Sequence, residues 1–175
     1  MSLKIPVGEQ DHIQGPATAK CTLVEYGDYE CPHCGHAYPI VKRIQKHFGK
    51  KLRFVFRNFP LNEMHPHAES AAETAEFAGS KGKFWEMHDL LFENQESLGG
   101  ALYTKLAKDI GLSADDLGRS LEKREFLAHV KSDFTGGVRS GVNGTPTFFF
   151  LGERYDGSFE YEDLLGAIQG ALELT

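Results

Sequence analysis

One segment constrains the fold more than any other, a Cys-x-x-Cys pair that stands between a strand pattern and a helix pattern. Residues 21–26 are mostly apolar and predict a buried strand, and the motif Cys31-Pro32-His33-Cys34 follows a few residues later. Apolar residues then recur at helical spacing over 38–48, which predicts a helix. A second strand is predicted over 52–57. Strand, helix and strand of these lengths predict a βαβ unit whose two strands are parallel.

The stretch 63–140 shows helix patterns and no convincing strand. Helices are predicted over 68–76, 84–92, 102–110, from Ser113 as N-cap onwards, and over 126–138. We therefore expect an α/β fold in which 1–62 and 141–175 form one discontinuous domain and 63–140 is an all-helical insertion. After the insertion come a predicted strand over 147–151, a turn at Gly152-Glu153, a return strand over 154–156 and a closing helix over 160–172.

The position of the two cysteines indicates their chemistry. Pro32 suits the first turn of a helix, where its missing N–H would have no intrahelical partner. Cys31 then lies at the helix N-terminus, where free N–H groups and the macrodipole favour a thiolate, and Cys34 lies on the same face, one turn deeper. Cys31 is predicted to attack a disulfide and Cys34 to resolve the mixed disulfide. In the oxidising direction a substrate thiolate attacks the Cys31 sulfur and Cys31 leaves.

His33, between the cysteines, is predicted to tune the redox poise. As an imidazolium or as a hydrogen-bond donor it would stabilise the Cys31 thiolate, and low-pKa cysteines in such motifs titrate from about 3.5 to 7. A pKa near 3.5 would raise the reduction potential by on the order of 100 mV, enough to turn a reductant into an oxidant. The alternative is a solvent-exposed spacer with little effect.

A Cys-x-x-Cys pair can also be half of a zinc site, which needs two further ligands. The candidates for these two ligands are His65 with His67, or Cys21 with a histidine. The chain has no second Cys-x-x-Cys pair, and Pro32 at a strand-to-helix junction favours the redox interpretation. We therefore predict no metal site and no cofactor.

Composition restricts the classes of function. The formal net charge is −6 and the basic residues do not cluster, which excludes a nucleic-acid footprint. No apolar window of about 18 residues exists, so no membrane span is predicted. The first 20 residues lack the apolar stretch of a secretory signal. We expect a cytoplasmic protein if the chain is complete, and a periplasmic or extracytoplasmic one if a signal peptide has been removed.

Four motifs in order resemble the DsbA-like branch of the thioredoxin superfamily, and the resemblance extends over about 12–172. They are Glu25-Tyr-Gly-Asp-Tyr-Glu-Cys-Pro-His-Cys, Phe59-Pro60-Leu61 with His65-Pro66, Gly82-Lys83-Phe84-Trp85-Glu86-Met87-His88-Asp89, and Gly144-Thr145-Pro146-Thr147. The resemblance implies a thioredoxin fold with a helical domain inserted before the Pro146 strand, and thiol–disulfide exchange on protein cysteines. The chain departs from the family at Lys20 and Cys21, and we interpret Cys21 as an inert buried thiol.

The resemblance also implies roles for residues outside the motif. Pro146 corresponds to a cis-proline beside the active disulfide, and the Thr145 backbone would hold an extended substrate segment together with Pro32. The alternative is an ordinary trans-proline at the start of a strand. Glu25 corresponds to a buried acid behind Cys34, with a raised pKa, that takes or gives the Cys34 proton. The alternative is a strand-edge acid that faces water.

Four further residues are given structural interpretations. His65 is interpreted as the residue that begins a helix. Phe84, Trp85 and Met87 are interpreted as core of the insertion, although they could line a groove for unfolded substrate.

We predict a thiol–disulfide oxidoreductase that works as a DsbA-like oxidase. Its partners would be protein or peptide thiols and disulfides, with a redox partner protein or glutathione completing the cycle. Two alternatives remain. One is a cytoplasmic reductase or isomerase of the same fold, and the other is a non-catalytic zinc- or peptide-binding module. A glutathione-dependent transferase is disfavoured because such enzymes usually lack a counterpart of Cys34.

Overall fold

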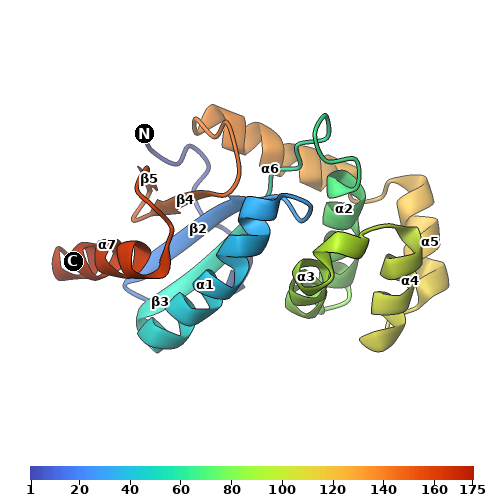
Figure 1. Cartoon of the computed structure of the whole chain (residues 1–175), viewed down its shortest axis with the longest axis horizontal. Helices are drawn as coiled ribbons and strands as arrows, with labels where there is room; N and C mark the ends of the chain where they lie inside the picture. Colours follow the sequence, from blue (N-terminus) through green and yellow to red (C-terminus); the bar gives the residue numbers. More distant parts are fainter.

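The computed structural model describes all residues, 1–175, and is built around a five-stranded sheet with the order β1-β3-β2-β4-β5. Strands β2 (Cys21–Gly27) and β3 (Leu52–Asn58) are parallel and lie at its centre, joined by helix α1 (Pro32–Phe48). The predicted βαβ unit is thus confirmed (Figure 1). Gly49 ends α1 with a φ of 51°, a backbone conformation that glycine adopts without strain.

The C-terminal part completes the sheet on the β2 side. Strand β4 (Thr147–Phe150) runs antiparallel to β2, and β5 (Glu153–Tyr155) forms a hairpin with it. The turn residues are Leu151 and Gly152, both with positive φ, rather than the predicted Gly152-Glu153. A two-residue hairpin turn of this kind needs positive φ at both central positions, and Glu153 already pairs with Phe150 in the ladder.

Strand β1 (His12–Gln14) was not predicted. It has three residues and pairs antiparallel with the outer edge of β3. Its single apolar residue, Ile13, is flanked by polar side chains, so no alternation long enough to indicate a strand exists. The hydrogen bonds to β3, and not the sequence of β1 itself, stabilise its extended conformation.

Helices separate β3 from β4 in the chain, as predicted. They are α2 (Ala68–Ser80), α3 (Phe84–Glu93), α4 (Gly100–Asp109), α5 (Ala114–Lys123) and α6 (Leu127–Arg139). A short 3₁₀ turn, η2 (Gln95–Ser97), lies between α3 and α4, and another, η1 (Gly49–Lys51), follows α1. The Ser113 hydroxyl accepts from the Asp116 N–H at 3.1 Å, which confirms the predicted N-cap. None of the helices is both long and apolar enough to cross a bilayer.

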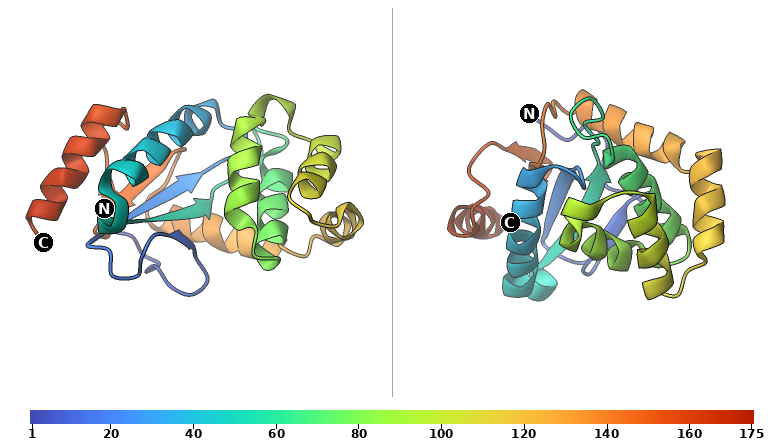
Figure 2. Two further views of the ribbon diagram at one scale, coloured as in Figure 1. Left: turned by 90° about the horizontal axis from the view of Figure 1, so that it is seen from below. Right: turned by 45° about the vertical axis from the view of Figure 1, so that its right-hand side comes forward.

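Helices cover both faces of the sheet. Helix α1 lies over one face with α3 beside it, α6 runs along the other face, and α2, α4 and α5 stand further out (Figures 1 and 2). The closing helix α7 (Tyr161–Glu173) packs against α1. One apolar cluster of 31 buried residues runs from the sheet through α1 into α2, α3 and α4. The fold is therefore the predicted α/β fold with a helical insertion, while the domain boundaries at 62/63 and 140/141 stay a prediction.

The alternation of side chains along β2 decides which residues reach the larger core. Leu23 belongs to the 31-residue cluster, and Val24 and Tyr26 belong to a smaller cluster of six on the opposite face. Glu25 therefore points to the same side as Leu23. Phe84 and Met87 are buried in the larger cluster and Trp85 packs against it, so these residues form core and not an open groove.

Candidate active site

The two cysteines of the motif lie at the start of α1, a few residues after β2 ends. Cys31 is the N-cap of α1 with an extended backbone, and Pro32 occupies the first turn, as predicted. Cys34 has no exposed surface and Cys31 only 4%. Both are free thiols, so the structure represents the reduced form. Pro32 and His33 are exposed, so a substrate can reach the turn that carries Cys31.

The environment of Cys31 favours its thiolate. The pKa of Cys31 is lowered to about 5, chiefly by a hydrogen bond from the Cys34 thiol, and burial opposes this shift. Hydrogen bonding by Thr145 and by the backbone N–H groups of His33 and Cys34 lowers the pKa further. The Thr145 hydroxyl is buried without another partner and is free to donate to the sulfur. When protonated, Cys31 donates to the Thr145 carbonyl at 3.5 Å.

The structure assigns His33 a smaller part than its position suggested. Its side chain is exposed and makes no hydrogen bond, and only its backbone N–H contributes to lowering the pKa of Cys31. The geometry thus fits the spacer alternative for the imidazole. The hydrogen bonds that lower the pKa of Cys31 come from Cys34, Thr145 and the helix N-terminus, and a role of the His33 imidazole in the redox poise stays a prediction.

Cys34 is the opposite of Cys31. Burial and the hydrogen bond it gives to Cys31 raise the pKa of Cys34 well above its usual value, and the charge of Glu25 adds to this. The backbone N–H of Asp28 donates to the Cys34 sulfur at 3.4 Å. One sulfur is therefore poised as an anion while its neighbour holds its proton.

Glu25 lies on the central strand β2 and is 3% exposed, so the alternative of a water-facing acid is wrong. Burial, with a contribution from the Cys31 charge, raises the pKa of Glu25 to about 8. Its Oε1 atom has no hydrogen-bond partner. A carboxyl group that is neutral at pH 7 and electrostatically coupled to both cysteines can give or take a proton there.

Asp28 organises the turn before Cys31, a role that the sequence analysis missed. Its buried carboxylate accepts from the N–H groups of Glu30 at 2.8 Å and Cys31 at 3.2 Å, and from the Leu61 N–H at 2.9 Å. An aspartate directly after a strand is a common turn former, which was the available signal.

His65 is the fourth partner of Asp28, through Nδ1 at 2.7 Å. It was interpreted as beginning a helix, but α2 begins at Ala68 and the His65 ring instead turns back to the active-site turn. Burial disfavours the imidazolium, yet the hydrogen bond and charge of Asp28 outweigh it, so the pKa of His65 is raised. The negative charge of Cys31 acts in the same direction.

Gln95 holds the active-site turn from the side of the helical insertion. Its Nε2 group donates to the carbonyls of Tyr29 at 2.9 Å and Cys31 at 2.8 Å. Gly35 leaves room for this contact, since a Cβ atom on residue 35 would collide with the Gln95 amide and displace it. No local sequence signal marks Gln95, because its partners are more than 60 residues away along the chain.

Thr145 and Pro146 lie beside Cys31 at the start of β4, and the peptide bond between them is cis. Pro146 also borders a small cavity of about 170 Å³ that is lined by β4, β5 and the segment after β5. The Thr145 carbonyl thus lies beside the Cys31 sulfur, and Pro32, the next residue, is exposed. The binding of substrate by Pro32, Thr145 and Pro146 stays a prediction.

The zinc alternative has no support in the geometry. His65 is bound to Asp28, and no group of three potential metal ligands includes a cysteine. Cys21 is fully buried at the start of β2, and burial raises its pKa to about 11, which fits an inert thiol.

A low-pKa cysteine at a helix N-terminus, with a second cysteine one turn further in, defines a thiol–disulfide oxidoreductase. The comparisons identify the family. The family model described as thioredoxin matches residues 8–170, so the chain belongs to the thioredoxin family.

Solved structures of thiol–disulfide oxidoreductases have the same fold as this chain. Oxidised BdbD from Bacillus subtilis is 26% identical with a TM-score of 0.86, over 94% of each chain. A thioredoxin-like oxidoreductase from Silicibacter pomeroyi is 26% identical with a TM-score of 0.83, over 95% of this chain and 94% of that one. Alpha-DsbA1 from Wolbachia pipientis, 18% identical, shares the fold with a TM-score of 0.80 over 98% of this chain and 92% of its own.

Curated relatives are longer proteins. The chain is 42% identical to Na⁺/H⁺ antiporter NhaA 1 of Salinispora arenicola over 100% of its own length and 27% of the relative. It is 40% identical to NhaA 3 of Salinispora tropica over 98% of its own length and 26% of the relative. The chain therefore spans about a quarter of the length of these curated relatives.

Proposed function

We propose that the protein oxidises pairs of thiols in protein or peptide substrates through the Cys31–Cys34 disulfide. The observation that carries this proposal is the opposed environment of the two sulfurs. The pKa of Cys31 is lowered to about 5, whereas that of Cys34 is raised. Stabilising one thiolate in the reduced form makes the disulfide a stronger oxidant.

The size of the effect follows from the Cys31 pKa. A thiol that titrates near 5 is two pKa units below pH 7, which stabilises the reduced form by about 3 kcal/mol relative to a thiol that stays protonated. For a two-electron couple this raises the reduction potential by about 60 mV. The effect is smaller than the 100 mV expected from a pKa near 3.5, but it has the same sign.

Two displacements complete the reaction. A substrate thiolate attacks the Cys31 sulfur of the disulfide, a mixed disulfide forms, and Cys34 leaves with the electron pair of the S–S bond. The second substrate thiolate then attacks the substrate sulfur of the mixed disulfide, and Cys31 leaves as a stable thiolate. The substrate loses two electrons and gains a disulfide, while the protein becomes a dithiol.

Glu25 handles the proton of the buried sulfur in this proposal. Since the pKa of Glu25 is raised to about 8, it carries a proton at pH 7 and can give it to Cys34 as that sulfur leaves. Cys34 is fully buried and Glu25 is 3% exposed, and the Oε1 atom of Glu25 has no protein hydrogen-bond partner that would hold the proton elsewhere. The reverse transfer would assist reoxidation by a redox partner protein or by glutathione disulfide.

The loop at Thr145 and Pro146 is proposed to hold the substrate. The Thr145 backbone lies next to the Cys31 sulfur, and an extended peptide could pair with it as a short added strand. The exposed surface of Pro32 would form the other side of this contact.

The deciding experiment measures the reduction potential of the Cys31–Cys34 pair in glutathione buffers, together with oxidation of a reduced, unfolded protein. We expect a potential well above that of the cytosolic glutathione pool and stoichiometric oxidation of the substrate. Cys31→Ser and Cys34→Ser should abolish turnover, and Cys21→Ala, the matched control, should retain it. A potential below that of glutathione would favour the reductase alternative, and activity in Cys31→Ser would refute the proposal.

A further inference from the structure

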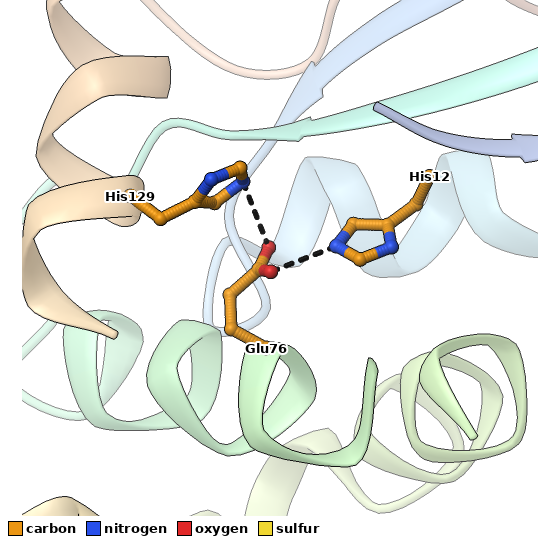
Figure 3. Close-up of side chains that lie close together, drawn as sticks. All are labelled: His12, Glu76 and His129. Carbon is orange, nitrogen blue, oxygen red and sulfur yellow. Dashed lines mark hydrogen bonds and ion pairs between the residues drawn. The ribbon is translucent and has the colours of Figure 1, made fainter. Parts of the chain in front are cut away.

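Away from the cysteines, three side chains from distant parts of the chain converge on one point (Figure 3). They are His12 on β1, Glu76 on α2 and His129 on α6, and one potential ligand atom of each lies within 4.8 Å of the others. His12 Nε2 is 2.7 Å from Glu76 Oε2, and His129 Nε2 is 3.5 Å from Glu76 Oε1. The two imidazoles approach the carboxylate from opposite sides.

The three groups are held in place by their surroundings. The Glu76 side chain is 5% exposed, and its Oε1 accepts from Asn58 Nδ2 at 2.8 Å. The His12 ring stacks on Phe84, with the ring centroids 3.6 Å apart and the planes 3° from parallel. Oriented imidazoles and a hydrogen-bonded carboxylate are the supporting contacts that metal ligands in proteins receive.

A second carboxylate borders the cluster. Asp133 Oδ2 is 3.6 Å from His129 Nε2, and it accepts from both the N–H and the Nδ2 of Asn58 at 3.0 Å. Asn58 thus fixes Asp133 and Glu76 together. A buried carboxylate (Glu76) and a half-buried one (Asp133) beside two half-buried imidazoles make a site whose charge a divalent cation would balance.

The spacing suits a small ion with nitrogen and oxygen ligands. Zinc lies about 2.0–2.2 Å from such atoms, so neighbouring ligand atoms of a tetrahedron are about 3.3 Å apart. The 3.5 Å from His129 Nε2 to Glu76 Oε1 is close to this spacing. The 2.7 Å from His12 Nε2 to the other carboxylate oxygen, Oε2, requires an outward shift of about 0.6 Å. His129 and Asp133 line a cavity of about 610 Å³, which gives an ion a route from solvent.

We propose that His12, Glu76 and His129 bind a divalent transition-metal ion of the zinc class, with Asp133 or water in the fourth position. Two imidazoles select such an ion over calcium or magnesium, which prefer oxygen ligands. The ion joins β1, α2 and α6, and so ties the sheet edge and the helical insertion together. The ligands are far apart in the sequence, which is why no spacing motif indicated a metal site.

The test uses the full chain with the Cys31–Cys34 disulfide formed, so that thiols do not compete for metal. Metal-free protein is titrated with Zn²⁺ by calorimetry and with Co²⁺ by visible absorption. We expect one equivalent to bind, with the intense bands of a four-coordinate cobalt site, and Tm to rise with Zn²⁺. Ca²⁺ and Mg²⁺ at the same concentration should change neither signal.

His129→Gln is the principal variant, because this partly exposed side chain can be replaced without disturbing the core. It should weaken Zn²⁺ binding by more than about 100-fold and abolish the rise in Tm. Glu76→Gln should do the same, if circular dichroism shows that it folds. The matched control is His36→Gln, an exposed histidine of α1 that pairs with Glu160 away from the cluster.

Unchanged Zn²⁺ affinity in His129→Gln would overturn the proposal, as would the absence of stoichiometric binding. Either result would leave a hydrogen-bonded network without an ion. Preferential binding of Ca²⁺ would overturn the assignment to a zinc-class metal. None of these outcomes bears on the redox proposal, because the cysteines take no part in the measurement.

Discussion

Replacing Glu25 with glutamine should stabilise the folded protein by an amount that depends on pH. The folded-state pKa of Glu25 is about 8, whereas an unfolded glutamate titrates near 4.3. Between these values the folded protein keeps a proton that the unfolded chain has lost, so wild-type stability falls as pH rises. Multiplying the 2.7-unit interval from about 4.3 to 7 by 1.36 kcal/mol gives a cost of about 4 kcal/mol at pH 7.

Glu25→Gln removes this cost because an amide cannot ionise. At pH 4 Glu25 is protonated in the folded protein and mostly protonated in the unfolded chain, so little of this cost is present. The free energy of unfolding of the variant, compared with that of wild type, should therefore be higher at pH 7 than at pH 4 by about 3–4 kcal/mol. Urea unfolding of the reduced proteins, followed by the fluorescence of Trp85, measures both differences. Glu122→Gln, at an exposed position of α5, is the control and should show no such change with pH.

The same variant separates stability from catalysis. If Glu25 also handles the Cys34 proton, its effect depends on the direction of the reaction. When the reduced protein is mixed with a disulfide, Glu25→Gln should slow resolution of the mixed disulfide by Cys34 while leaving the attack of the Cys31 thiolate unchanged. When the oxidised protein is mixed with a dithiol, the variant should slow the first displacement, in which Cys34 leaves. In the oxidised protein the Cys31 charge is absent, so the stability gain should be smaller there. Equal free-energy differences at pH 4 and pH 7 would refute the buried, neutral carboxyl on which both expectations rest.

Three further variants test the surroundings of Cys31. Cys34→Ala should raise the pKa of Cys31 by about 1–2 units, because it removes the largest stabilising hydrogen bond, and thiolate absorbance against pH would contradict this if the midpoint stayed near 5. Asp28→Asn should destabilise the fold by about 1–3 kcal/mol in urea unfolding and return the pKa of His65 toward its usual value, as NMR titration can follow. Gln95→Ala, which leaves two backbone carbonyls without their donor, should cost about 1–3 kcal/mol, and a loss below measurement error would show that water replaces the amide.

Local sequence patterns predicted most of the fold because the elements that carry it are locally consistent. The strand over 21–26, the helix after Cys31 and the strand over 52–57 each show their own periodicity. Strand β1 was not predicted because its stability comes from pairing with β3 and not from its own three residues. The same limit applied to the hairpin turn, where the register of Phe150 and Glu153 decides which residues adopt positive φ.

The features of the active site that are local in sequence could also be predicted, whereas those set by distant residues could not. Cys31 and Cys34 are neighbours in sequence, so their chemistry could be inferred from spacing and from the helix N-terminus. What sets their geometry comes from elsewhere: Asp28 ties the turn to His65, and Gln95 ties it to the helical insertion. The imidazole of His33 was expected to stabilise the Cys31 thiolate. Its side chain is exposed, and the hydrogen bonds that lower the pKa of Cys31 come from Cys34, Thr145 and backbone N–H groups. Because a hydrogen bond to a charged sulfur is worth more where water is excluded, the strongest influence on Cys31 is its buried partner, and the redox properties of the motif depend on how the insertion closes over it.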